Sequence, residues 1–191
     1  GTIAFAGRHR TQAVALLGDL RIGDSLDVRV LRAGKRIDLE LKLKPYQTLV
    51  RRKQYDVQPR FLLWGGLVLQ PLSEDFLDTW NEWRRRAPTI LVHAFKSGMR
   101  SEKQHEMVVL ARVLADESTA GYDDREFEIV EEIDGDLVKN LQHAAELFKK
   151  AQGLITLKTH RGLIVLDVEK ALERNDAIKL RYQIPSSSRL G

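Results

Sequence analysis

The sequence predicts an α+β fold, because segments that alternate apolar and polar residues, as β-strands do, flank segments with helical spacing. The most informative stretch begins at Ile129, where an alternating strand leads to a tight turn at Asp134-Gly135. An amphipathic helix over 137–151 and a second alternating strand over 153–159 follow. A strand beside a helix, with an open edge between them, makes a groove for an extended peptide.

The first 45 residues contain too few elements to close a core. Residues 10–17 have the apolar content of a short helix that ends at Gly18, and the alternation over 26–31 and 37–43 predicts a β-hairpin. A helix and one hairpin cannot bury enough surface alone, so residues 1–45 are interpreted as half of a domain whose first half is missing. The polar and basic segment 46–54 is interpreted as a linker.

Residues 55–191 are predicted to form a second and larger domain. Ser73, with two acidic residues after it, predicts the start of a helix that runs to about Arg84. An insertion near 81–105 follows, and within it residues 89–95 have a β-like pattern. The apolar run 61–71 contains two adjacent glycines, which suggest a loop. The remaining predicted elements are strands over 106–114, 127–133, 153–159 and 163–167, the helix 137–151, and a last helix over 169–174 with a further helical turn over 177–182.

Composition limits the class of protein without naming a function. The chain has 191 residues, of which 43% are hydrophobic and 30% charged, so it can fold around a core. The net charge of +4 comes from interspersed acids and bases, which does not by itself indicate nucleic-acid binding. There is no cysteine, which excludes disulfides and cysteine-ligated metals. No apolar run approaches the ~18 residues that a membrane span needs.

The three strongest patterns together resemble a known family. The stretch Gly23-Asp-Ser-Leu-Asp-Val-Arg-Val-Leu-Arg-Ala-Gly-Lys35 resembles the closing hairpin of PDZ domains in HtrA/Deg-type serine proteases. The stretch from Ile133 to Ala151 resembles the strand–helix unit of such a domain, and Phe61 to Leu72 resembles its carboxylate-binding loop and the next strand. The whole pattern is most similar to the branch with an extended second PDZ domain.

The resemblance implies a PDZ-like mixed or antiparallel β-sheet partial barrel capped by two helices, preceded by a partial PDZ unit of a helix plus a β-hairpin. It also implies a trypsin-like protease domain before Gly1, and the bacterial periplasm or another protein quality-control compartment as the location. The implied function is non-catalytic: peptide or unfolded protein segments bind by strand addition and regulate substrate recruitment or assembly. The protein's own protease domain and sister subunits are the other implied partners.

The peptide site implied by this family lies between the strand near Leu67–Leu69 and the helix 137–151. On their own, two adjacent glycines more often mark a bulge or bend in a sheet. The family context favours the other interpretation, in which backbone N–H groups at Gly65, Gly66 and Leu67 bind a peptide carboxylate. Leu141 is favoured over His143 as the residue at the head of the groove. The full set of predicted peptide-binding residues is Trp64, Gly65, Gly66, Leu67, Val68, Leu69, Leu141, Ala145 and Phe148.

A second surface combines basic and aromatic residues. Trp80 and Trp83 come just before the run Arg84-Arg85-Arg86. Such a pattern suits a contact between proteins, as in an oligomer. The alternative function is therefore a closed-groove oligomerisation module of the same protease. Interleaved basic and aromatic residues also bind single-stranded nucleic acid, but such runs are more often solvated, so this third function is less favoured.

The sequence predicts no catalytic, metal or cofactor site. None of the serines lies in a Gly-x-Ser-x-Gly elbow or in the Gly-Asn-Ser-Gly-Gly run of trypsin-like enzymes. His105-Glu106 lacks the second histidine of a zincin helix. The chain is therefore predicted not to be an enzyme itself, although the resemblance implies that its parent protein is a serine endopeptidase.

Overall fold

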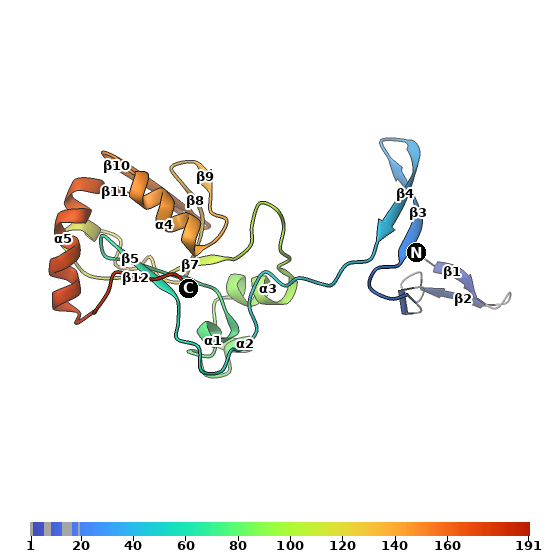
Figure 1. Ribbon diagram of the computed structural model, residues 1–191, viewed down its shortest axis with the longest axis horizontal. Helices are drawn as coiled ribbons and strands as arrows, with labels where there is room; N and C mark the ends of the chain where they lie inside the picture. Colours follow the sequence, from blue (N-terminus) through green and yellow to red (C-terminus); the bar gives the residue numbers. More distant parts are fainter. Residues whose placement is uncertain (1, 6–8, 13–16, 19) are drawn as a thin grey trace. The chain divides into compact units, whose positions relative to one another are not determined.

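A computed structural model of the chain describes residues 2–5, 9–12, 17–18 and 20–191 (Figure 1). The chain divides into two compact units, Gly1–Tyr46 and Gln47–Gly191. Leu49 and Val50, in the middle of the predicted linker, are buried, and Leu49 N donates to Gly98 O. Part of the predicted linker therefore packs as a piece of the second unit.

The described residues of the first unit include two β-hairpins. Strands β1 (Thr2–Phe5) and β2 (His9–Gln12) pair with each other, as do β3 (Ser25–Arg32) and β4 (Lys35–Lys42). The helix expected over 10–17 is wrong at its start, because the pairing with β1 makes 10–12 a strand; residues 13–16 lie outside the described part of the chain. In this unit the side chains of residues 9–10, 12, 17–18 and 20–46 are described, and none of them is buried.

The second unit is built on one antiparallel sheet with the strand order β11-β10-β8-β7-β6-β5-β12, and β9 pairs with β8. The strands expected over 106–114, 127–133, 153–159 and 163–167 are confirmed; the apolar segment 61–71 forms two strands joined by a turn, and β9 and β12 were not expected. Their bounds are β5 (Phe61–Trp64), β6 (Leu67–Pro71), β7 (Val108–Val113), β8 (Glu128–Ile133), β9 (Asp136–Leu137), β10 (Leu154–Thr159), β11 (Gly162–Asp167) and β12 (Ser188–Arg189).

One face of this sheet packs against two helices. Helix α4 (Leu141–Lys150) begins after Asn140, whose side chain accepts from His143 N, and the predicted start at 137 is wrong because 136–137 form β9. Helix α5 (Val168–Arg181) is continuous, where an interrupted helix was expected. The first core cluster joins both helices to the strands through side chains such as Leu69, Val130, Ile155, Phe148 and Ala171.

The predicted insertion near 81–105 builds a second core cluster. Val109 and Ile129 belong to this cluster, whereas Val108 and Val130 belong to the first one. Because side chains alternate along a strand, the two clusters lie on opposite faces of the sheet. The insertion thus covers the face away from α4.

Three short helices, grouped together in Figure 1, carry this second cluster. They are α1 (Glu74–Leu77), α2 (Trp83–Arg86) and α3 (Thr89–Ser97). One helix over 73–84 was expected, but the chain adopts a left-handed φ of 53° at Glu82. The strand expected over 89–95 is also wrong: Leu91, Val92 and Phe95 have helical spacing and are buried together after Pro88.

The fold class expected from the sequence is confirmed. The second unit is an α+β domain in which a largely antiparallel sheet is packed by helices, as a PDZ-like fold requires.

Candidate functional site

The paired glycines form the tight turn between β5 and β6. Trp64 pairs with Leu67, so Gly65 and Gly66 are the two central residues of a hairpin. Their φ angles are +53° and +92°, as a type I′ turn requires. A Cβ at Gly65 would lie 2.5 Å from Ala171 Cβ, and one at Gly66 would lie 2.8 Å from Thr119 Cγ2. The turn is therefore buried beneath α5 and the 115–122 loop.

The strand predicted to receive a peptide is paired along both edges. In β6, Leu67 and Leu69 pair with Trp64 and Leu62 of β5 on one side and with Val113 and Leu110 of β7 on the other. Strand addition needs a free row of N–H and C=O groups. A peptide could add to β6 only if β5 first left that edge.

Strand β5 also contacts the helix that was expected to form the other wall of the groove. The ring of Trp64 stacks on the ring of Phe148, with centroids 4.6 Å apart. Leu141, Ala145 and Phe148 are all buried in the first core cluster together with Trp64. The structure thus brings the predicted residues together, but as a packed core with β5 in the place expected for a ligand.

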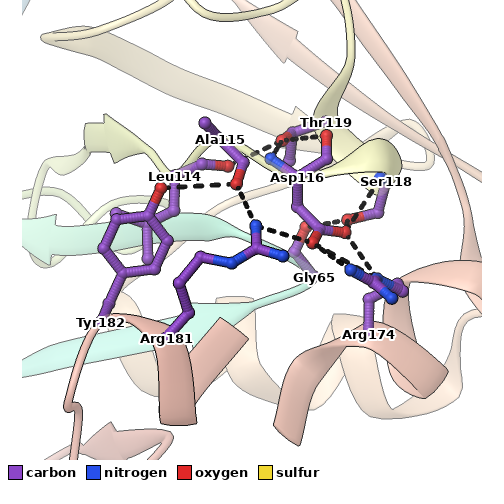
Figure 2. A network of polar contacts seen from close by, with 9 residues as sticks. All are labelled: Gly65, Leu114, Ala115, Asp116, Ser118, Thr119, Arg174, Arg181 and Tyr182. Carbon is purple, nitrogen blue, oxygen red and sulfur yellow. Dashed lines mark hydrogen bonds and ion pairs between the residues drawn. The ribbon is translucent and has the colours of Figure 1, made fainter. Parts of the chain in front are cut away.

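A buried carboxylate holds α5 over the glycine turn (Figure 2). Asp116, whose side chain is fully buried, accepts hydrogen bonds from Arg174 and from Ser118 N, and Arg181 lies 3.4 Å away. The Ser118 hydroxyl also donates to Gly65 O, at 3.1 Å. The hydrogen bond from Arg174 outweighs the effect of burial and holds the pKa of Asp116 well below its usual range.

The rest of this loop is fastened through main-chain groups. Arg181 donates to Ala115 O, as does the Tyr182 hydroxyl (Figure 2). Leu114 N donates to Gly66 O at 2.8 Å, so the loop is tied to both α5 and the turn. Sequence reasoning missed this cover, because the Asp116–Arg174 pair joins residues 58 positions apart.

In the predicted tryptophan–arginine surface, the three arginines are exposed, whereas Trp83 is buried and Trp80 is half-buried. Trp83 is 5% exposed and packs edge-on against Phe95, while half-buried Trp80 packs against Phe127. The side chains of Arg84, Arg85 and Arg86 are exposed, and the Arg84 guanidinium lies 4.4 Å from the centre of the Trp83 ring. Trp83 is thus a core residue that anchors the short basic helix α2, and Trp80 packs against the same cluster.

A second charged group, which sequence reasoning did not find, lies at the start of β5. Buried Glu106 accepts two hydrogen bonds from Arg60 and pairs with Arg51 at 3.0 Å. Burial alone would raise the pKa of Glu106, but the hydrogen bond and charge of Arg60, together with Arg51, lower it overall. The Arg60 Nε donates to Leu190 O, so this group also holds the segment after β12.

The described residues contain no cluster of three or more His, Cys, Asp or Glu side chains that could bind a metal ion. Among these residues no helix is long and apolar enough to cross a membrane.

The comparisons with known proteins agree with this architecture. The family model of the PDZ domain matches residues 50–189. The chain is similar to three proteins of Arabidopsis thaliana: "Putative protease Do-like 11, mitochondrial" (26% identity over 96% of this chain and 29% of that protein), "Protease Do-like 2, chloroplastic" (27% over 97% and 31%) and "Protease Do-like 4, mitochondrial" (27% over 97% and 34%).

The chain thus spans about a third of the length of these relatives, and its match covers a PDZ domain and not a protease domain. The resemblance drawn from the sequence is confirmed: this chain is a PDZ region similar over most of its length to Do-like (HtrA) proteases, and it belongs to the PDZ domain family.

Proposed function

We propose that this region is a non-catalytic protein-interaction module of a Do-like serine endopeptidase, and that it serves assembly with its strand-addition groove closed. PDZ domains bind peptides or proteins, which supports the general role. The observation that carries the finer proposal is the position of β5. It pairs with β6 and packs against α4 through Trp64, where a peptide would otherwise add.

Peptide capture at Leu67–Leu69 is the competing proposal. It requires β5 to leave β6, which would break the pairing of three residue positions and expose Trp64. Burying an aromatic side chain contributes about 1.5–3 kcal/mol, so a ligand would have to replace substantial packing energy. The closed arrangement is therefore the one that the geometry favours.

The assembly surface we propose is the exposed arginine run on α2. Among the described residues, the ion pairs of Arg84 and Arg85 are long, at 3.9 Å to Glu74 and 4.0 Å to Glu82. Most of their charge is thus available to an acidic surface of a sister subunit or of the protease domain. Nucleic-acid binding is less well supported, because base stacking needs exposed aromatic rings and Trp83 is buried.

Sedimentation of the chain over a range of concentrations tests this proposal. Self-association, or association with the separate protease domain, should weaken when Arg84→Glu and Arg86→Glu are combined. It should also weaken with salt, because exposed charges are screened over ~8–10 Å at physiological ionic strength. Lys149→Glu, at the exposed end of α4, is the matched control and should leave the mass distribution unchanged.

Two results would contradict the assembly proposal. One is a chain that stays monomeric, does not bind the protease domain, and binds C-terminal peptides with chemical-shift changes on β6 and α4. The other is a steeply salt-dependent affinity for single-stranded nucleic acid that is lost in the arginine double variant.

A further inference from the structure

The two outermost strands of the sheet differ in how their edges are protected. On β11, the Tyr122 hydroxyl donates to Val165 O and accepts from Val165 N, and Arg125 donates to Leu163 O. These side chains thus form hydrogen bonds with backbone groups of β11 at Leu163 and Val165. At the other end of the sheet, β5 is covered by β12, which is only two residues long.

Strand β12 forms only a short ladder with β5. Ser188 pairs with Leu62 and Arg189 with Phe61, and Leu63 N donates to Ser187 O at 2.7 Å. Both residues of β12 have exposed side chains. Such a strip covers the edge of β5 but buries little surface, so its removal would cost far less than the removal of β5 itself.

The segment has its own point of attachment. The chain reverses after α5 at Gln183, which has a left-handed φ of 54°, and Pro185 follows two residues later. Ile184 N already donates to Lys179 O, so the end of α5 is satisfied before β12 begins. Strand β12 could therefore leave β5 without unwinding the helix.

Where this segment packs against α5, one buried side-chain atom lacks a hydrogen-bond partner among the described residues. Asn175 on α5 donates through Nδ2 to Ser187 Oγ at 3.2 Å. Its Oδ1 is buried, and no described residue donates to it. A buried acceptor without a partner costs free energy, and a carboxamide in place of the serine hydroxyl could accept from Nδ2 and donate to Oδ1 together.

The other contacts of this segment define what a ligand would need. The Arg189 guanidinium lies 5.9 Å from the centre of the Phe61 ring and donates to Pro59 O. Leu190 packs against the first core cluster, and its carbonyl accepts from Arg60 Nε. These contacts select an arginine followed by an aliphatic residue.

We infer that the outer edge of β5 is a strand-addition site, and that its ligand is an extended protein segment with the pattern Asn or Gln, any residue, Arg, aliphatic. The chain's own segment 187–190 occupies this edge when no ligand is bound. We call it the placeholder, and it fits the edge less well than the proposed ligand would. This inference rests on the proposed role as a protein-interaction module and assigns it a second surface, distinct from the arginine run.

The test uses the whole chain and two acetylated, amidated and fluorescently labelled peptides. One repeats residues 184–191, and the other repeats them with the change Ser187→Asn. The double variant Arg189→Ala, Leu190→Ser weakens the attachment of the segment 187–190, and it substitutes no residue of β5. This variant should bind both peptides about tenfold more tightly than the unaltered chain, as fluorescence anisotropy would show. Leu180→Ser, at an exposed position on α5, is the control and should not change the affinity.

The role of Asn175 gives a second readout. The peptide with asparagine should bind several-fold more tightly than the one with serine, and Asn175→Ala should reduce this ratio to about one. In nuclear magnetic resonance spectra, the amides of Leu62 and Leu63 should shift on binding while the resonances of β6 keep their positions.

Three results would overturn the inference. The loosened variant could remain folded, by its circular dichroism spectrum and melting temperature, yet not bind either peptide. The peptides could instead bind to β6 with β5 detached. Two copies of the chain could exchange their 186–191 segments and form a dimer, which would assign the edge to a second copy. None of these results tests the assembly surface, which the sedimentation of the arginine variants tests separately.

Discussion

The indole of Trp64 lies on the phenyl ring of Phe148, with planes inclined by 27° and centroids 4.6 Å apart. Trp64 ends β5, and Phe148 is in the last turns of α4, so this contact joins the strand and the helix between which a PDZ ligand was expected. The closed state proposed for the groove would therefore rest on side-chain packing as well as on the pairing of β5 with β6.

Truncating either ring should destabilise the domain strongly. Phe148→Ala and Trp64→Ala should each lower the free energy of unfolding by about 3–5 kcal/mol, because each leaves a cavity in a packed cluster. A cycle with Trp64→Leu and Phe148→Leu should give a coupling energy of about 0.5–1.5 kcal/mol for the stacked pair. Urea denaturation followed by circular dichroism measures both.

The control is Leu163→Ala, since this side chain is 57% exposed and should change stability by less than about 0.5 kcal/mol. A coupling energy near zero would mean that the two rings are adjacent without stabilising each other, and the packing argument for closure would then be wrong.

Gly65→Ala should be more harmful than Gly135→Ala, although both residues have positive φ angles. The backbone cost of a left-handed residue with a Cβ is about 1–2 kcal/mol at both positions. At Gly135 a Cβ would meet nothing within 4 Å, whereas at Gly65 it would lie 2.5 Å from Ala171 Cβ. Thermal unfolding should show an additional loss of about 1–3 kcal/mol for Gly65→Ala, as overpacking costs.

A second substitution separates the two contributions. Ala171→Gly makes room for the new Cβ, so adding it to Gly65→Ala should recover stability, although glycine inside a helix itself costs about 1 kcal/mol. If the double variant shows the plain sum of the two single losses, then α5 does not press on this turn.

Acid should weaken the attachment of α5 to the 115–122 loop. The pKa of Asp116 is lowered in the folded protein, so its contribution to stability is fully present above the unfolded value of about 3.9. It is lost as the pH falls from there toward the lower folded pKa, because protonation removes the charge that Arg174 binds. Asp116→Asn should lower stability at pH 7 and flatten the fall in stability below about pH 4.

Arg174→Gln should flatten the same part of the profile, because it removes the partner and leaves the carboxyl group in place. Urea midpoints measured from neutral pH down to about pH 2 provide the comparison. An Asp116→Asn profile that falls as steeply as that of the unaltered chain would assign the acid sensitivity to another group, for which Glu128 is the next candidate. Burial would raise the pKa of Glu128, but Arg125, Thr159 and Arg161 lower it overall.

Local patterns predicted most of the strands and one helix correctly, because alternation and capping depend only on residues that are close together in the sequence. The hairpin β3–β4, the strands β10 and β11, and the core side of α4 are examples. The family resemblance supplied the set of residues around the groove, of which Trp64, Leu141 and Phe148 do meet in one cluster.

What neighbouring residues do not specify is the tertiary partner of each edge. The paired glycines are consistent with both an open carboxylate loop and a buried type I′ turn, and the difference depends on Ala171, more than 100 positions later. The two-residue strand β12 has too few residues to show alternation, and it forms only because β5 is beside it. The role of the predicted peptide-binding residues thus stays a prediction.

The break between α1 and α2 leads to a last prediction, in which a substitution stabilises the protein. Glu82 has a left-handed φ of 53°, which costs a residue with a Cβ about 1–2 kcal/mol relative to glycine. Its side chain offsets little of this, since its ion pair with Arg85 is exposed and 4.0 Å long. Glu82→Gly should raise the free energy of unfolding by up to about 1 kcal/mol, because the greater flexibility of unfolded glycine cancels part of the gain.

Glu82→Ala is the matched control, since alanine removes the same carboxylate but keeps the Cβ and hence the backbone cost. It should be neutral or slightly destabilising, so that the two variants differ in sign in the same denaturation experiment. Equal melting temperatures for Glu82→Gly and Glu82→Ala would show that the backbone at 82 is not strained. The two short helices would then owe their separation to the packing of Leu77 and Trp83 in the second core cluster alone.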